Sequence, residues 1–226
     1  MNLQILYEDN HLIAVNKSVS DLVQGDKTGD VTLPERIKQY LKETYNKSGN
    51  VFCGVTHRLD RPVSGVVLFA KTGKALKRMN ALFQQHGVHK IYWAIVGNAP
   101  QAPEGTLLNY IVRNERLNKS FAYDMPCNGA KLAVLHYRTL AHSQHYTLLE
   151  VQIETGRHHQ IRCQLAQIGA AIKGDLKYGA PRSNPEGGIA LHARSIAFEH
   201  PVSHQHVCIT APVPDNRLWQ EISKGI

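Results

Sequence analysis

Short apolar runs separated by turn residues follow one another along most of the chain, a pattern that predicts more strands than helices. An apolar pair at Ile5-Leu6 and a run at Leu12–Val15 flank Glu8-Asp9-Asn10, which predicts a strand, a turn and a strand. The apolar run at residues 65–70 is too short for a helix and is expected to be a buried strand. Further strands are expected at residues 89–96, 132–140, 146–154, 191–198 and 207–210. The second and third of these are expected to pair as a hairpin.

Three segments have helical spacing instead. The first begins at a capping box, Thr32–Glu35, and is expected to end near Lys47. The second follows Thr72-Gly73 and ends at Gly87, and the third ends at Gly169. Few helices together with hairpins predict an α+β fold with a mixed, mostly antiparallel sheet flanked by helices and loops.

Nothing in the pattern divides the chain. Its 226 residues suit a single domain spanning residues 1–226. A Pro-rich stretch at residues 98–105 allows a linker, but a surface loop is the preferred interpretation. There is no internal repeat.

Charge adds a hint about partners. Lys and Arg number 26 against 18 Asp and Glu, which gives a formal charge of +8. Such a surplus attracts polyanions such as RNA. Charge alone leaves a basic protein without a nucleic-acid partner as an equal alternative.

The cysteines, the N-terminus and the length of the apolar runs bear on the cellular compartment. Four cysteines lie far apart and form no C-x-x-C, which argues against a zinc knuckle and fits a reducing environment. The N-terminus does not resemble a signal peptide, and no apolar run approaches the roughly 18 residues of a membrane helix. The expectation is a cytoplasmic protein that does not enter membranes.

One segment, residues 57–65, places a carboxylate among potential cations just before a buried strand. Nearby cations favour an ionised carboxylate, and an ionised Asp60 on a rigid turn could act as a nucleophile. The alternative is a structural Asp60 in a salt-bridged turn.

A second segment, residues 155–162, leads into the third helix and is followed by a turn at residues 174–179. Arg162 comes four positions after His158, so both are expected on one helix face. An arginine there could grip a carboxylate through two hydrogen bonds. His158 and His159, as helix neighbours about 100° apart, make a poor pair of metal ligands.

These segments resemble the motifs of RluA-type pseudouridine synthases. Residues 57–65 resemble the catalytic H-R-L-D-x-x-x-S-G, and residues 90–97 resemble the K-x-Y-x-A-x-V-x-G strand. The other similar segments, in the order of the family, are TGR-x-HQIR at 155–162, GD-x-x-YG at 174–179, LHA at 191–193, F-x-HP at 198–201 and AP-x-P at 211–214.

The resemblance implies roles for particular residues. Asp60 is the expected catalytic aspartate, Arg162 its ion-pair partner, and Tyr92 the active-site tyrosine that packs on uracil. Arg58 is expected to enter the RNA stack when the target nucleotide leaves it, and Leu191 to line the base pocket. His57 and Arg61 complete the expected RNA-binding residues.

The resemblance also implies a basic cleft, no cofactor and no metal. The expected partner is structured ribosomal or transfer RNA, and the expected oligomeric state is a monomer. Unlike many relatives, the sequence is expected to lack an S4-type RNA-binding domain. It departs from the family pattern at Val63, at His158, at Cys163-Gln164 and at residues 17–20, which puts substrate choice in doubt more than chemistry.

Two other functions remain as alternatives. A noncatalytic RNA-binding protein or chaperone could use the same fold, although Asp60, Tyr92 and Arg162 are all present. A glycoside or nucleoside hydrolase would normally need a second acidic residue in a comparable motif, and none is found. Three routes for Asp60, through the sugar C1′, a glycal or the uracil C6, also remain open.

Overall fold

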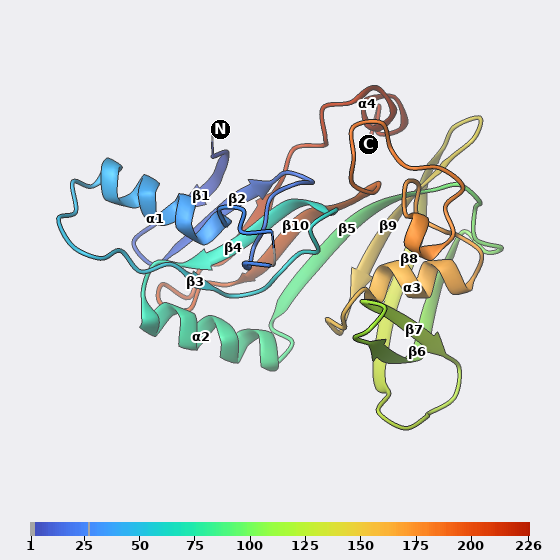
Figure 1. Cartoon of the computed structure of the whole chain (residues 1–226), viewed down its shortest axis with the longest axis horizontal. Coiled ribbons are helices and arrows are strands. Elements are labelled where there is room, and N and C mark those ends of the chain that lie inside the picture. The colour runs from blue at the N-terminus through green and yellow to red at the C-terminus, as the bar shows by residue number, and fades with distance from the viewer. Residues whose placement is uncertain (1–2, 27) are drawn as a thin grey trace. The chain divides into compact units, whose positions relative to one another are not determined.

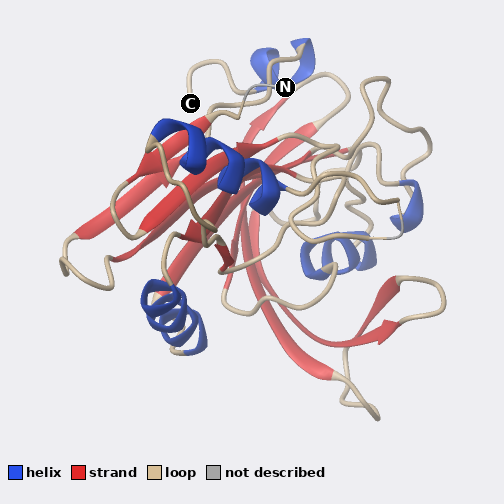
Figure 2. Ribbon diagram, turned by 60° about the vertical axis from the view of Figure 1, so that its left-hand side comes forward, coloured by secondary structure: helices blue, strands red, loops and turns tan. Residues whose placement is uncertain are grey.

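Strands outnumber helices in the computed structural model, which describes residues 3–26 and 28–226 (Figure 2). The chain forms two compact units. The first comprises residues 1–88 and 193–212, and the second comprises residues 89–192 and 213–226. The predicted α+β class with a largely antiparallel sheet is confirmed.

The first unit is built on strands in the order β1-β2-β4-β10, with β3 paired to β4 and β11 paired to β10 (Figure 1). The strands are β1 (Ile5–Glu8), β2 (Leu12–Lys17), β3 (Gly54–Val55), β4 (Ser64–Ala70), β10 (Leu191–Glu199) and β11 (His206–Thr210). The pairs β1–β2, β2–β4, β3–β4 and β10–β11 are antiparallel. All seven residues of β4 are buried, so this strand lies at the centre of the unit's core.

Two helices belong to the same unit, α1 (Leu33–Thr44) and α2 (Gly73–Gln84). At the start of α1, the Glu35 carboxylate accepts from the Thr32 N–H over 2.7 Å, as the capping box predicts. The helix ends three residues before the expected Lys47, because Asn46 has a left-handed φ of 49°. At the start of α2, the Thr72 hydroxyl accepts from the Ala75 N–H over 3.1 Å.

The second unit has five strands in the order β5-β9-β8-β6-β7. They are β5 (Val88–Val96), β6 (Glu104–Asn114), β7 (Lys119–Tyr123), β8 (Lys131–His142) and β9 (Thr147–Ile153). Each neighbouring pair is antiparallel. Helix α3 (Gln160–Gln167), the 3-10 turn η1 (Leu176–Tyr178) and helix α4 (Arg217–Ile222) complete the unit.

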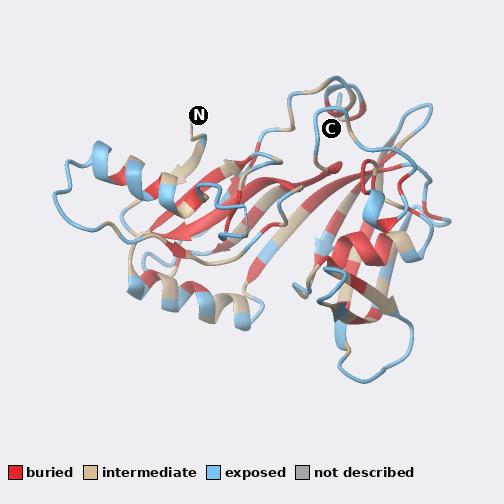
Figure 3. Cartoon of the chain, viewed as in Figure 1, coloured by how far each residue is buried: buried red, intermediate tan, exposed pale blue. Residues whose placement is uncertain are grey.

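Helix α3 is largely buried against one face of this sheet (Figure 3). Ile111 on β6 and Ala133 on β8 pack with Cys163 of the helix and Tyr178 of η1. This small cluster fixes α3 and η1 on the sheet, and these are the two segments that carry the family-like motifs of the unit.

Most predicted elements are confirmed, including the β8–β9 hairpin and the strand at residues 89–96. Residues 98–103 form a loop between β5 and β6, as the surface-loop interpretation predicted. The β6–β7 hairpin was not predicted. Leu107 and Leu108 are adjacent on β6 and point to opposite faces, which hides the alternation that marks a strand.

Candidate active site

Asp60 lies in a turn that leads directly into β4. The Val63 N–H donates to the Asp60 carbonyl over 3.0 Å and closes the turn around Pro62. The strand that follows is wholly buried, whereas Asp60 itself is half-buried. The core therefore anchors the turn while the carboxylate keeps some access to solvent.

A buried lysine holds this turn from below. Lys17 is 1% exposed. Its ammonium donates to three backbone carbonyls, which include those of Arg61 at 2.9 Å and Val63 at 2.7 Å. Burial lowers the pKa of Lys17 to about 8, and the charges of Asp21 and Asp60 oppose that shift. Each of the three N–H donors of the buried Lys17 ammonium therefore has a carbonyl acceptor.

Lys17 belongs to residues 17–20, a segment that the sequence analysis noted only because it departs from the family pattern, and no role was predicted for Lys17. A signal was present, because the apolar run Leu12–Val15 of this buried strand is followed closely by a charge. A buried ammonium needs carbonyl or carboxylate partners. Its partners could not be named without the fold.

Gly65 allows the strand after the turn to approach its neighbour. Its φ is 114°, and a Cβ built there would lie 2.3 Å from the carbonyl oxygen of Ala193 on β10. Only glycine fits this conformation and this distance. The glycine of the motif is therefore a packing requirement of the first unit.

The three expected RNA-binding residues near Asp60 differ in what they contact. The His57 ring accepts from the Leu68 N–H over 3.1 Å, so it is part of the local structure. Arg58 is exposed and donates to the side-chain oxygen of Gln24. Arg61 is paired with two carboxylates of the segment between β2 and α1, Asp26 at 3.3 Å and Asp30 at 2.6 Å.

Tyr92 and Leu191 both lie on strands and are buried. Tyr92 on β5 is opposite Val151 on β9 and is 7% exposed. Leu191 is the first residue of β10 and is 3% exposed. Strand positions hold side chains more rigidly than loops do, which suits residues expected to shape a pocket.

Arg162 is held by a carboxylate that the sequence analysis did not assign. Its Nε donates to Asp175 Oδ2 over 2.7 Å, and its Nη2 donates to Asp175 Oδ1 over 2.9 Å. Both side chains are buried. This two-point contact fixes the plane of the guanidinium. Asp175 belongs to the GD-x-x-YG turn, and its position 13 residues after Arg162 gave no hint of contact.

Tyr178 of the same turn supports Arg162 from a second side. The guanidinium carbon of Arg162 lies 5.0 Å from the ring centroid. The Tyr178 hydroxyl accepts from the Ser120 N–H over 2.8 Å and donates to the Ser120 carbonyl over 3.2 Å. Burial raises the pKa of Tyr178 well above its usual range. The hydroxyl therefore stays protonated and joins η1 to the edge strand β7.

The expected placement of His158 and Arg162 on one helix face is wrong. Helix α3 begins at Gln160, and its N-cap His159 has a left-handed φ of 53°. His158 thus lies before the helix, and its ring stacks on that of His159 at 3.8 Å between centroids. The left-handed residue turns the chain between His158 and Arg162, so helical spacing does not apply there.

His159 is uncharged at neutral pH. Burial, with smaller contributions from the charges of Arg162 and His158, lowers the pKa of His159 to about 2. Its Nδ1 lies 2.9 Å from the Tyr178 hydroxyl. His159 therefore supports the α3–η1 junction as a neutral hydrogen-bonding group.

Some negative findings apply to the described residues. Within residues 3–26 and 28–226, no three His, Cys, Asp or Glu side chains are grouped to hold a metal ion. No helix in those ranges has the length and apolarity to cross a membrane. All four cysteines are free thiols. Burial raises the pKa of Cys53 and of Cys163 to about 12, so neither is a reactive thiolate.

The candidate residues are divided between the two units. His57, Arg58, Asp60 and Arg61 follow one another in the first unit, on a segment that Lys17 supports. The second unit contains the other three, Tyr92, Arg162 and Leu191. Of these, Arg162 is held by Asp175.

Comparison with known proteins adds to this geometry. Residues 11–167 match the profile of a family described as RNA pseudouridylate synthase. Ribosomal large subunit pseudouridine synthase D of Xanthomonas campestris is 33% identical over 228 residues, which cover 95% of this chain and 67% of the relative. The tRNA pseudouridine synthase C of Pectobacterium carotovorum is 30% identical over 227 residues, which cover 92% of this chain and 58% of the relative. The chain thus spans about two thirds of the length of the first and less of the second.

A solved structure has the same fold. The human RNA pseudouridylate synthase domain containing 4 protein superposes with a TM-score of 0.79 at 23% identity, covering 94% of this chain and 89% of that one. At 23% identity, this similarity shows that the two proteins share a fold.

Proposed function

Because the chain belongs to the RNA pseudouridylate synthase family, we propose that it converts uridine to pseudouridine in ribosomal or transfer RNA, with Asp60 as the catalytic aspartate. The observation that carries the proposal is the Asp60 turn, with a half-buried carboxylate ahead of a buried strand and the Lys17 ammonium beneath it. The names of a large-subunit ribosomal and a tRNA relative support these two classes of RNA.

The reaction needs few participants. The bond between uracil N1 and C1′ breaks, the uracil turns, and C5 bonds to C1′ as C5 loses its proton. No electron carrier or energy donor is consumed. An ionised Asp60 suits attack on C1′, proton removal leading to a glycal, or attack on the uracil C6.

Arg162 is proposed to pair with Asp60 and keep it ionised. The contact of Arg162 with Asp175 supports this role. A guanidinium has five N–H donors in one plane, and Asp175 accepts from Nε and Nη2 along one edge. With that edge fixed, the donors of the other edge have a defined direction toward a second acceptor.

Tyr92 and Leu191 are proposed to bind the uracil. A tyrosine ring suits stacking on a base, which contributes about 1–3 kcal/mol per base in single-stranded recognition. The Tyr92 hydroxyl is proposed to assist removal of the C5 proton. Leu191 is proposed as an apolar wall. Their burial on strands β5 and β10 supports a fixed pocket.

The target base must leave its stack, at a cost of a few kcal/mol. Arg58 is proposed to enter the vacated position, and its exposure supports that role. His57 and Arg61 are proposed as further RNA contacts. Since Arg61 is already paired with Asp26 and Asp30, we expect it to contribute less affinity than Arg58.

We further propose that residues 1–226 act as one catalytic domain, because the family motifs are divided between both units. A monomer acting in the cytoplasm is proposed as the working form. Four free thiols are consistent with a reducing compartment.

The proposal is tested by replacing the carboxylate with an isosteric amide. Asp60→Asn is expected to lower pseudouridine formation by at least about 10³-fold, since it removes the reacting group. The affinity for RNA is expected to change by less than about 3-fold, because phosphate contacts dominate it. Modification mapping of total RNA from cells lacking the protein, complemented with each variant, identifies the sites and the activity.

A matched control is Asp215→Asn, which removes an exposed carboxylate elsewhere in the chain. It is expected to modify RNA like the wild type. Full activity of Asp60→Asn would overturn the role of Asp60. If no pseudouridine in the mapped RNA depended on the wild-type protein, the proposed activity would be overturned, and a noncatalytic RNA-binding protein would be favoured.

A further inference from the structure

The second unit carries a group of cations to which the motif comparison assigned no role. It consists of five side chains, here called the β7 basic surface: Arg113, Lys119, Lys131, Arg157 and Lys177. None of them forms an ion pair with a carboxylate in residues 3–26 and 28–226. Other exposed arginines, such as Arg61, Arg138 and Arg217, do have such a partner.

Strand geometry directs two of these cations to one face. Ile111 on β6 and Ala133 on β8 face helix α3 and pack against it. Arg113 comes two residues after Ile111, and Lys131 comes two residues before Ala133. Side chains two apart on a strand share a face. Both cations therefore project from the α3 side of the sheet, and both are exposed.

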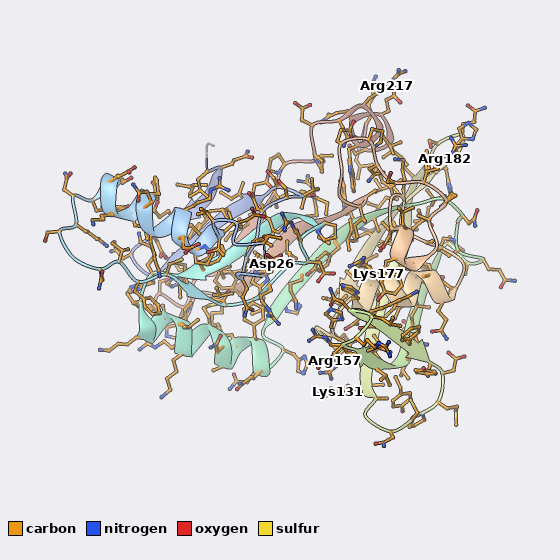
Figure 4. All side chains as sticks on the ribbon, in the orientation of Figure 1. Asp26, Lys131, Arg157, Lys177, Arg182 and Arg217 are labelled. Carbon is orange, nitrogen blue, oxygen red and sulfur yellow. The ribbon has the colours of Figure 1, made fainter. Side chains whose placement is uncertain are left out.

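The other members come from segments on that same side. The Arg157 Nε donates to the Leu132 carbonyl over 2.9 Å, which places it next to Lys131. In Figure 4 the labels of Arg157 and Lys131 lie close together, with Lys177 above them. The Lys177 Nζ donates to the Asn118 carbonyl over 2.9 Å, at the start of β7.

Lys119 lies between aromatic rings. Its Nζ is 5.0 Å from the centroid of Tyr178 and 5.5 Å from that of Phe121. The Arg162 guanidinium is also 5.0 Å from the Tyr178 ring. Cations interleaved with aromatic rings are typical of surfaces that bind nucleic acid.

The crowding of positive charge is visible at a neighbouring residue. Burial lowers the pKa of His159, and the charges of Arg162, His158, Lys177 and Arg113 contribute to the same shift, to about 2. Lys177 and Arg113 thus lie close enough to act on one side chain together with Arg162. Such an arrangement is unfavourable alone and is relieved by an anionic ligand.

We propose that the β7 basic surface binds the phosphate backbone of the substrate RNA, as a contact region additional to His57, Arg58 and Arg61. This inference rests on the proposed function, which supplies RNA as the polyanion. The members lie on three strands, one loop and one short turn that a common core holds together. A preformed set of cations of this kind binds backbone without selecting bases.

The test removes three charges whose loss breaks few internal contacts. The variant combines Arg113→Gln, Lys131→Gln and Lys177→Gln. Of these three side chains, only that of Lys177 makes a hydrogen bond within the described residues. The matched control, Arg182→Gln with Arg217→Gln and Lys224→Gln, removes the same charge from exposed positions elsewhere in the second unit. Both sets are made in Asp60→Asn, so that binding is measured without turnover. Thermal unfolding verifies that both fold.

The probe is a fluorescein-labelled RNA stem-loop with uridines in the loop. At about 100 mM salt we expect the surface variant to raise Kd at least about 10-fold, and the control less than about 2-fold. The slope of log Kd against log salt should fall by about 2–3 in the surface variant, since each lost phosphate contact removes about one. Equal Kd and equal slope in the two variants would overturn the inference.

Failure of this inference is distinguishable from failure of the proposed function. If the wild type forms pseudouridine and the surface variant binds RNA like the control, the surface is wrong and the activity stands. If the wild type forms no pseudouridine but the surface variant loses RNA affinity, the activity is wrong and the surface still binds RNA.

Discussion

Lys17 is the residue whose surroundings differ most from those that its type prefers. Burying an ammonium is costly unless its donors are satisfied. Here every donor meets a carbonyl, and two of those carbonyls belong to the turn that presents Asp60. Lys17, to which the motif comparison assigned no role, is therefore the internal support of the candidate catalytic turn.

The depressed pKa of Lys17 predicts a pH effect on stability. Burial lowers it from 10.5 in the unfolded chain to about 8 in the folded one. Between these values the unfolded state binds more protons, so the free energy of unfolding should rise with pH, by up to about 3 kcal/mol. Lys17→Met should remove this contribution, so that the rise becomes smaller; burial also lowers the pKa of Lys90, whose contribution remains. Urea unfolding at pH 7.5, 9 and 10 measures it.

An exposed lysine provides the comparison for that experiment. Lys42 on α1 is exposed, and Lys42→Met should leave the rise intact. If Lys17→Met retained the same increase between pH 7.5 and pH 10 as the wild type, the assignment of the depressed pKa to Lys17 would be wrong.

At the scale of elements, the junction between β4 and β10 depends on one glycine. Gly65 combines a φ of 114° with an approach to the Ala193 backbone that leaves no room for a Cβ. Backbone atoms cannot move aside as a flexible side chain can. The motif glycine thus sets the distance between the strand that follows Asp60 and its neighbour.

Gly65→Ala is therefore expected to destabilise the protein by more than about 3 kcal/mol, through the clash and the strained φ together. Gly73→Ala at the start of α2 is the control, because a Cβ there meets no atom within 4 Å. It should be neutral or slightly stabilising, by up to about 1 kcal/mol. Denaturant midpoints compare the two, and an equally stable Gly65→Ala would show that the two strands can separate without cost.

The elements also show what the sequence could predict. Strands with strong apolar runs, such as β4 and β5, were predictable because burial on both faces leaves a continuous apolar pattern. The β6–β7 hairpin was not, because its exposed face carries apolar side chains such as Leu108. Contacts between distant residues, Arg162 with Asp175 above all, were not predictable, since chain topology and not local pattern brings them together.

At the scale of the whole molecule, the surplus of 26 cations over 18 anions has a function only if it is not neutralised internally. Several cations are neutralised, among them Arg36 by Asp21 and Lys71 by Glu8. Within residues 3–26 and 28–226, the five cations of the β7 basic surface form no ion pair, and they lie together in the second unit. The net charge alone left RNA binding and a basic protein without a nucleic-acid partner as equal alternatives. The grouping of these cations on one surface favours a polyanion partner.

A ligand that binds only the folded chain must stabilise it by mass action, so RNA is expected to protect the whole protein against heat. RNA at about 100 times Kd should add about 2.7 kcal/mol, a rise in Tm of several degrees for a chain of this size. Because counter-ion release drives phosphate contacts, the rise should disappear near about 0.5 M salt. Asp60→Asn should show the same rise, since the effect requires binding and not turnover. Differential scanning fluorimetry at low and high salt, with dextran as an uncharged polymer control, measures it. A rise that persists at high salt would mean that base or apolar contacts, and not the surplus positive charge, hold the RNA.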